Sequence, residues 1–171
     1  PANNAGGEPT QIGEDSGTDI VIGDNGMAIF DTRTGVQLLN KIRSFEPLIG
    51  DVDYIFTDRG PDVVIGGTAG DVIDAGTDEG GDLELDVVIA DNGTGLFDVD
   101  TGESLLIDLR TTDPEIEASG DDIVTTGGGN DVILGGSGSD DLDAGADFFK
   151  DVVLGDNGGT WFYLSQILQF A

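Results

Sequence analysis

The sequence predicts an all-β fold, a parallel β-roll or β-solenoid with projecting β-hairpins, and three observations support this class. Aspartate recurs at nine-residue intervals in two stretches, and each aspartate begins a short run that ends near glycines. The apolar runs are short and rich in Val and Ile, without a 3.6-residue period. Glycine accounts for 29 of 171 residues without a three-residue period, which excludes collagen and indicates a turn-rich β structure.

The predicted strands of the roll are three-residue apolar runs that follow an aspartate. Most of them are bounded by glycine on the other side, so each run is too short for a helix and ends in a turn. The clearest runs are residues 20–22, 63–65, 87–89, 132–134 and 152–154.

Two blocks of the chain, residues 53–76 and 122–145, repeat one another at an offset of 69 residues. Their regularly spaced aspartates are Asp53, Asp62 and Asp71 in the first block and Asp122, Asp131 and Asp140 in the second.

A longer repeat lies over the short one. An Asp-Asn-Gly turn follows the apolar run in residues 19–26, again in 86–93 and again in 151–158. We therefore expect one elongated repeat domain over residues 1–171. It is divided into a partial unit 1–50, a unit 51–118 and a unit 119–171.

Each Asp-Asn-Gly turn leads into an excursion. Residues 26–39 align with 93–106, and both read as strand, glycine-containing turn and strand, which predicts a β-hairpin. The apolar segment 159–170 occupies the same place in the last unit. It is too short to cross a membrane, so we expect a third hairpin there.

The amino-acid composition limits the classes of partner that the chain can bind. The chain has 35 acidic and 6 basic residues, no His and a net charge of -29. Nucleic acids and anionic membranes are bound through clustered Lys and Arg, so neither is an expected partner. Without Cys or His the usual zinc ligands are missing, which leaves a hard, oxygen-preferring cation to relieve the repulsion. The chain starts at Pro1 without a signal peptide and has no 18-residue apolar run, so we expect a mature product or an excised segment and no membrane span.

Residues 135–143, Gly-Gly-Ser-Gly-Ser-Asp-Asp-Leu-Asp, match every fixed position of the nonapeptide G-G-x-G-x-D-x-U-x, where U is a large aliphatic residue. On this motif the chain resembles the hemolysin-type calcium-binding repeats, the RTX family. The resemblance implies six-residue loops that alternate with three-residue strands, so that two nonapeptides form one 18-residue coil of a calcium-stabilised β-roll. The pattern also has an independent reason. Glycine allows turns that aim carbonyls inward, and aspartate adds carboxylates, the ligands that Ca²⁺ prefers.

Stacking of these coils then predicts which aspartates lie next to one another. Residues 18 apart share a side of the roll, so we expect Asp53 beside Asp71 and Asp122 beside Asp140 on one edge. The Asp-Asn-Gly turns are expected to stack beside this edge as closing turns.

On the other edge we expect Asp62 to face Asp86, and Asp131 to face Asp151. The residues that bulge from the intervening loops are then 77–85 and 146–150. About six to eight calcium sites would result. Their predicted ligands are Asp19, Asp24, Asn25, Asp53, Asp62, Asp71, Asp86, Asp91, Asn92, Asp122, Asp131, Gly135, Ser137, Asp140, Asp151, Asp156 and Asn157.

Some features depart from the repeat or have an ordinary structural explanation. Asp58 replaces a glycine in one loop, and Ala69-Gly70 exchanges two loop positions. Asp74 and Asp143 follow the strand's aliphatic residue and are either further ligands or solvated. An Asp-Asn-Gly turn alone is a common hairpin signal. The aromatic residues are expected to pack on the hairpins, with a carbohydrate platform as the alternative; they are Phe30, Phe97, Trp161, Phe162 and Tyr163.

These observations predict a calcium-binding structural module that is not an enzyme, because no His, Cys or G-x-S-x-G nucleophile is present. The expected role is in an adhesin shaft, surface layer, matrix or fibre, secreted from or on the surface of a bacterial cell, where millimolar calcium drives folding. Neighbouring repeats or other copies are the expected partners, and no small-molecule substrate is evident. The alternative is an RTX secretion and folding module of a toxin, protease or lipase; a carbohydrate- or ice-binding module is a third possibility.

Overall fold

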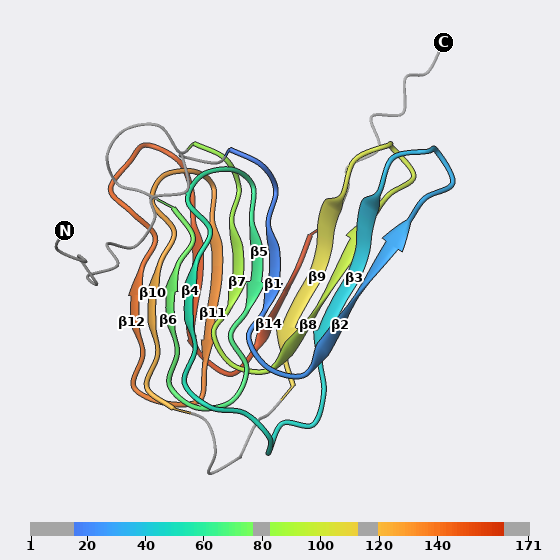
Figure 1. Cartoon of the computed structure of the whole chain (residues 1–171). Helices are drawn as coiled ribbons and strands as arrows, with labels where there is room; N and C mark the ends of the chain where they lie inside the picture. The colour runs from blue at the N-terminus through green and yellow to red at the C-terminus, as the bar shows by residue number, and fades with distance from the viewer. Residues whose placement is uncertain (1–15, 77–82, 113–119, 163–171) are drawn as a thin grey trace, which may run out of the picture.

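The computed structural model describes residues 16–76, 83–112 and 120–162. These residues form fourteen β-strands in three sheets and no helix, so the all-β prediction is confirmed. The sheets lie side by side as three layers (Figure 1). We name them the outer sheet, the middle sheet and the hairpin sheet.

The middle and outer sheets are parallel and contain the strands predicted from the nine-residue repeat. The middle sheet has the order β1 (Ile20–Ile22), β5 (Val63–Ile65), β7 (Val87–Ile89), β11 (Val132–Gly136) and β13 (Val152–Asp156). The outer sheet has the order β4 (Tyr54–Phe56), β6 (Val72–Asp74), β10 (Ile123–Thr125) and β12 (Asp141–Asp143).

The chain crosses between these two sheets after every strand in its repeat blocks. It runs from β4 to β5, back to β6 and on to β7, and β10 to β13 follow the same course (Figure 1). Parallel neighbours in one sheet are therefore two strands apart in the repeat blocks. In the outer sheet this brings residues 18 apart side by side, as with Tyr54 and Val72.

The excursions form the third layer, an antiparallel hairpin sheet. Its order is β2 (Gly26–Asp31), β3 (Leu38–Ser44), β8 (Gly93–Asp98), β9 (Leu105–Thr111) and β14 (Gly159–Trp161). The two complete hairpins turn at Gly35 and Gly102, whose φ angles are +82° and +89°. The expected third hairpin lies outside the described residues beyond Phe162.

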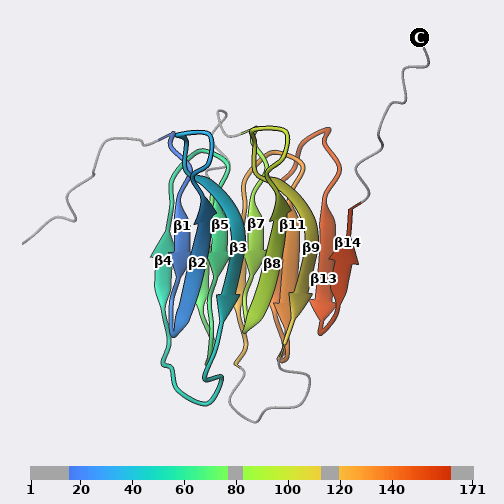
Figure 2. The ribbon, with the colours of Figure 1, turned by 90° about the vertical axis from the view of Figure 1, so that its right-hand side faces the viewer.

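The hairpins do not project from the roll, contrary to the sequence prediction. They pair with one another and cover the middle sheet (Figure 2). The reason is apolar surface on both layers. Ile42 and Leu109 of the hairpins are fully buried in one cluster with Ile65 and Leu134 of the middle sheet. Exposing such a cluster would cost roughly 1.5–3 kcal/mol for each large side chain.

A second apolar cluster fills the space between the middle and outer sheets. Val64, Val88 and Ile133 of the middle sheet pack there against Ile73 and Val124 of the outer sheet. The three central middle strands, β5, β7 and β11, are thus buried on both faces, which explains their unbroken apolar runs. In the outer strands only the central residue points inward.

The junction between one repeat unit and the next recurs in the hairpin sheet. Arg43 of β3 pairs with Thr94 of β8, and Arg110 of β9 pairs in the same way with Gly159 of β14. A hydroxyl group marks each junction, because Gly93 N donates to Ser44 Oγ at 2.9 Å and Gly158 N donates to Thr111 Oγ1 at 3.0 Å.

Candidate metal centre

The aspartates that begin the strands form two continuous ladders along the edges of the parallel sheets. The aspartates of the middle ladder, which precede strands of the middle sheet, are Asp19, Asp62, Asp86, Asp131 and Asp151. The aspartates of the outer ladder, which precede strands of the outer sheet, are Asp53, Asp71, Asp122 and Asp140.

Each rung is a hydrogen bond from one aspartate's backbone N–H to the next aspartate's carboxylate. In the outer ladder Asp53 N donates to Asp71 Oδ1 at 2.8 Å, and the bonds continue to Asp122 at 2.7 Å and Asp140 at 3.2 Å. The middle ladder has four such bonds, between 2.8 and 3.1 Å. All four expected neighbour pairs are hydrogen-bonded in this way.

Every aspartate of the outer ladder has the same kind of second carboxylate oxygen. The Oδ2 atoms of Asp53, Asp71, Asp122 and Asp140 are all buried and lack a hydrogen-bond partner in the structure. Asp71 and Asp122 are almost completely inaccessible as whole residues, with exposed fractions of 0% and 1%. A buried charge without a partner is strongly unfavourable, so these four oxygen atoms need either a proton or a cation.

Burial also governs the ionisation of this ladder. The pKa of Asp71 is raised to about 7 and that of Asp122 to about 8, chiefly by desolvation on burial and to a smaller extent by repulsion from neighbouring carboxylates. Desolvation on burial is also the main cause that raises the pKa values of Asp53 and Asp140. A bound cation would reverse this effect, because opposite charge favours the ionised carboxylate.

Main-chain carbonyl oxygens approach the same carboxylates. A Cβ atom on Gly23 would collide with both Asp53 Oδ2 and Gly66 O, and one on Gly135 would collide with both Asp140 Oδ2 and Gly155 O. Gly66 meets Asp71 Oδ2 and the carbonyl of Ala90 in the same way. None of these three glycines has a positive φ, so the close approach of the oxygen atoms, not the backbone conformation, excludes a side chain.

The Asp-Asn-Gly turns add further carboxylates at this edge. Thr68 N donates to Asp24 Oδ2 at 2.6 Å, and Ser137 N donates to Asp91 Oδ2 at 2.5 Å. Charge repulsion from Asp24 and Asp91 contributes to the raised pKa of Asp71, and Asp156 acts likewise on Asp140. These turns therefore stack beside the outer ladder, as expected.

The asparagines of the same turns serve as donors. The amide nitrogens of Asn25 and Asn92 donate to the carbonyls of Ile49 and Gly67, both at 3.0 Å, and that of Asn157 donates to Ser137 Oγ at 2.5 Å. Their amide groups thus join neighbouring coils. Asn157 Oδ1 is buried without a hydrogen-bond partner and is free to accept a cation.

The middle ladder has its own polar partners. Thr126 Oγ1 donates to Asp131 Oδ2 at 2.8 Å. The loops that depart from the repeat keep its turn shape, because Asp58 adopts φ +66° where Gly127 of the other block has +76°. Ala69 likewise has φ +79° where Gly138 has +141°. The unusual residues therefore keep the positive φ that glycine has at the matching positions.

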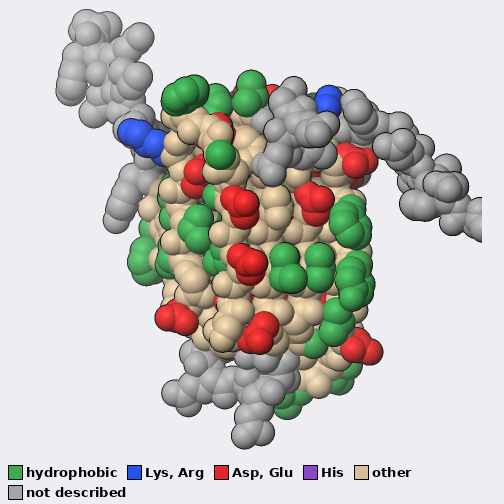
Figure 3. Space-filling view, turned by 90° about the vertical axis from the view of Figure 1, so that its left-hand side faces the viewer, with side chains coloured by type: hydrophobic (Ala, Val, Ile, Leu, Met, Phe, Trp, Pro, Cys, Tyr) green, Lys and Arg blue, Asp and Glu red, His purple; other side chains and the backbone are tan. Residues whose placement is uncertain are grey.

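Asp74 and Asp143 lie on the face of the outer sheet that points away from the middle sheet. Asp143 is exposed, and Asp74 is partly exposed. Figure 3 shows this face, with acidic and apolar side chains beside one another. Neither residue belongs to a ladder.

The oxygen atoms of the outer ladder suit calcium by type. Calcium takes six to eight oxygen ligands, commonly carboxylates and carbonyls. In the described part of the chain no three carboxylate side chains gather to hold a metal ion. Main-chain carbonyls such as those of Gly66, Ala90 and Gly155 would have to complete any site. Sequence reasoning included Gly135 but missed Gly23 and Gly66, which occupy the same position after their strands.

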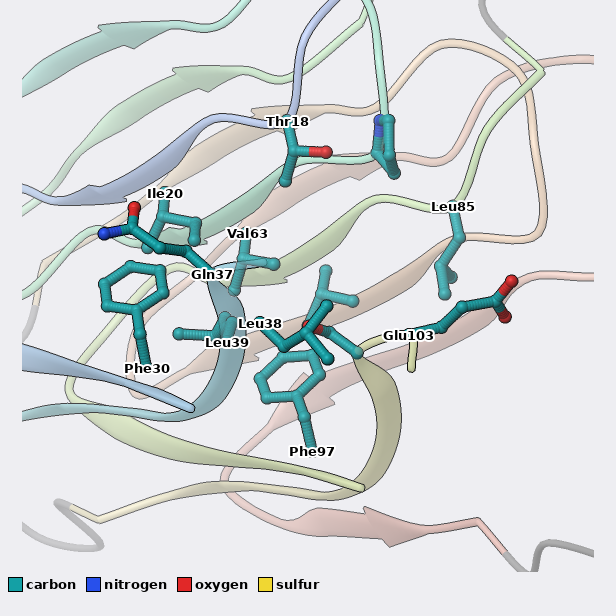
Figure 4. Close-up of a pocket in the computed structure, with 13 residues that line it drawn as sticks. Thr18, Ile20, Phe30, Gln37, Leu38, Leu39, Val63, Leu85, Phe97 and Glu103 are labelled. Carbon is teal, nitrogen blue, oxygen red and sulfur yellow. The ribbon is translucent and has the colours of Figure 1, made fainter. Parts of the chain in front are cut away.

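A separate apolar cavity of about 520 Å³ opens between the middle and hairpin sheets (Figure 4). Ile20, Val63 and Val87 line it from one side, and Leu39 and Phe97 from the other. Most of its lining residues are apolar. The described segments contain no helix of the length and apolarity needed to cross a membrane.

Comparison with family models, curated proteins and solved structures finds no match to this chain.

Proposed function

We propose that this chain is an extracellular calcium-binding repeat module of the hemolysin type, a β-solenoid in which calcium ions in the turns hold the stacked coils together. Its role is structural, as part of an adhesin shaft, surface layer, matrix or fibre. The observation that carries the proposal is the outer ladder, in which four buried carboxylate oxygens lack partners and three of them converge with main-chain carbonyls.

Electrostatics supports a folding event that is coupled to binding. The ladders place carboxylates one coil apart, in a chain of net charge -29. Two like charges 4 Å apart repel by about 4 kcal/mol at an effective dielectric constant of 20. About seven Ca²⁺ ions would contribute roughly 14 positive charges, reducing the net charge to near -15. Extracellular calcium at millimolar concentration would saturate such sites, whereas cytosolic calcium would not.

The repeated junctions support a structural role. The register of β3 with β8 recurs between β9 and β14, together with its hydroxyl contact. A unit that contacts each neighbour in the same way can extend along one axis. Neighbouring units are accordingly the proposed partners.

A calcium titration from a calcium-free start, followed by far-ultraviolet circular dichroism, tests the proposal. We expect a cooperative gain of β signal with calcium and none with magnesium at the same concentration, since magnesium is smaller and sheds its water reluctantly. A full β spectrum that is present without calcium and unchanged by it would refute coupled folding.

Substitution tests the ladder assignment. Asp131→Asn with Asp140→Asn changes one carboxylate in each ladder and should lower calcium affinity and cooperativity, because amide oxygens carry no charge. Asp141→Asn with Asp143→Asn is the matched control on the exposed face of β12 and should leave both unchanged. Equal affinity in the two double variants would exclude the ladders as the binding sites.

A further inference from the structure

The outer ladder places one oxygen pair at each of the four steps between neighbouring strands of the middle sheet. Each pair joins an aspartate Oδ2 to the carbonyl oxygen of the residue that follows the three-residue apolar run of a middle strand. At three steps both oxygen atoms of the pair lie close to the position that a Cβ atom would take on Gly23, Gly66 or Gly135. The fourth step, between β7 and β11, differs.

Ala90 occupies the glycine position at this step. The Ala90 N–H donates to Leu134 O at 2.9 Å. The two glycines make the equivalent bond to the next strand, also at 2.9 Å: Gly66 N donates to Ile89 O, and Gly23 N donates to Ile65 O. The ladder bond from Asp71 to Asp122 and the pairing of Ile89 with Leu134 continue the same register. By this equivalence, the oxygen pair that faces Ala90 consists of Asp122 Oδ2 and Gly135 O.

The Ala90 methyl group takes up the space that the other steps leave to oxygen. At Gly23, Gly66 and Gly135 a Cβ atom would overlap both oxygen atoms of the pair. Since Ala90 has such an atom and is fully buried, both oxygens must stand farther from it, and therefore farther from the point on which they converge elsewhere. A calcium site needs ligands at about 2.3–2.6 Å from one centre, so this separation weakens it.

We infer that Ala90 weakens calcium binding at the step between β7 and β11, so that this step is a poorer calcium site than the other three steps of the outer ladder. The inference rests on the proposed function. The chain consequently binds one calcium ion fewer along this ladder than its aspartate spacing predicts, and Asp122 is the carboxylate left without one.

Counting the ions bound to Ala90→Gly by native mass spectrometry at saturating calcium tests the inference. We expect one more ion than in the unsubstituted chain. Ala75→Gly is the matched control, because Ala75 is equally buried in the same apolar cluster but follows an outer strand. It should leave the ion count unchanged.

A second substitution keeps the inference testable if the ion count of Ala90→Gly is affected by a loss of stability. Asp122→Asn should leave the ion count of the unsubstituted chain unchanged and should remove the added ion from Ala90→Gly. An unchanged count in Ala90→Gly, or loss of an ion when Asp122 alone is replaced, would overturn the inference while leaving the proposed function intact. Absence of calcium from the unsubstituted chain would instead overturn both.

Discussion

At the scale of single residues, the surroundings of the second carboxylate oxygen differ from one ladder aspartate to another. Asp131 of the middle ladder accepts a hydrogen bond from Thr126, whereas Asp71 and Asp122 of the outer ladder have a buried Oδ2 without a partner. An aspartate that begins a strand of the repeat is thus hydrogen-bonded by a hydroxyl at Asp131 and left to a proton or a cation at Asp71 and Asp122. The unpartnered oxygens of the outer ladder make two properties measurable, the dependence of stability on pH and the need for glycine beside the ladder.

The first concerns pH. The pKa of Asp71 is raised to about 7 and that of Asp122 to about 8, above the ordinary value of 3.8. Between pH 4 and these values the folded state holds protons that the unfolded state has lost, so stability falls as pH rises through the window. Without calcium, the melting temperature should therefore be higher at pH 5 than at pH 8.

With saturating calcium the trend should reverse, because protons then compete with the cation for the carboxylates. Thermal unfolding followed by circular dichroism at both pH values, with and without calcium, measures the four quantities. The double variant Asp71→Asn with Asp122→Asn removes both titrating groups and should flatten the calcium-free dependence. An undiminished dependence in this variant would assign it to other carboxylates.

The second prediction concerns the glycines beside the ladder. Gly66→Ala would place a methyl group against Asp71 Oδ2 and the Ala90 carbonyl, so calcium affinity should fall about tenfold or more, which corresponds to about 1.4 kcal/mol. Gly155→Ala is the control, because it keeps the Gly155 carbonyl and its Cβ atom would meet nothing within 4 Å. Isothermal titration calorimetry compares the two, and an equal affinity would mean that the space above Gly66 is not part of a site.

At the scale of elements, the hairpins complete the core of the middle sheet. Both faces of β5, β7 and β11 are buried, one against the outer sheet and one against the hairpins. The hairpin strands are joined to each other across units, and Arg110 lies 5.8 Å from the ring of Trp161 at the β9–β14 junction. Removing hairpin side chains should consequently destabilise the parallel sheets.

Leu109→Ala tests this coupling. Leu109 is fully buried between the layers, so its truncation should lower the free energy of unfolding by about 2–5 kcal/mol in the presence of calcium. Leu48→Ala is the matched control, since Leu48 is 72% exposed and should change stability by less than about 0.5 kcal/mol. Urea unfolding at fixed calcium gives both values, and a Leu109 effect as small as the control would show that the hairpin sheet adds nothing to the fold.

At the scale of the whole molecule, charge opposes the compact state that the apolar clusters favour. The chain has a net charge of -29. Nine of its aspartates lie in the two ladders, where hydrogen bonds join each aspartate to the next coil. The two apolar clusters provide the attraction, but the repulsion must be relieved before the coils stack.

We therefore expect a large change in dimensions on calcium binding. For 171 residues, the radius of gyration is about 44 Å for an unfolded chain and about 16 Å for a compact one. Small-angle X-ray scattering should show a fall toward the smaller value with calcium but not with an equal concentration of magnesium. A compact particle in calcium-free buffer at pH 8 would show that the apolar clusters suffice without an ion.

The sequence alone determined the strands and the ladder neighbours. The Val/Ile runs predicted all five strands of the middle sheet. In the three central strands β5, β7 and β11 the run is apolar throughout because both faces are buried. The spacing of 18 residues predicted the contacts of Asp53 with Asp71 and of Asp122 with Asp140, because a fixed coil length brings equal positions together.

Only the tertiary structure decided where the hairpins lie and which carboxylate oxygens lack partners. Their packing against the middle sheet depends on apolar faces that meet across layers, and alternation within a hairpin says nothing about what covers it. Whether an aspartate oxygen has a hydrogen-bond partner depends on residues distant in sequence. Asp71, for example, donates to the carboxylate of Asp122, which is 51 residues away. Spacing specifies that two coils stack, whereas the atoms that meet between them are fixed only by the register of the folded chain.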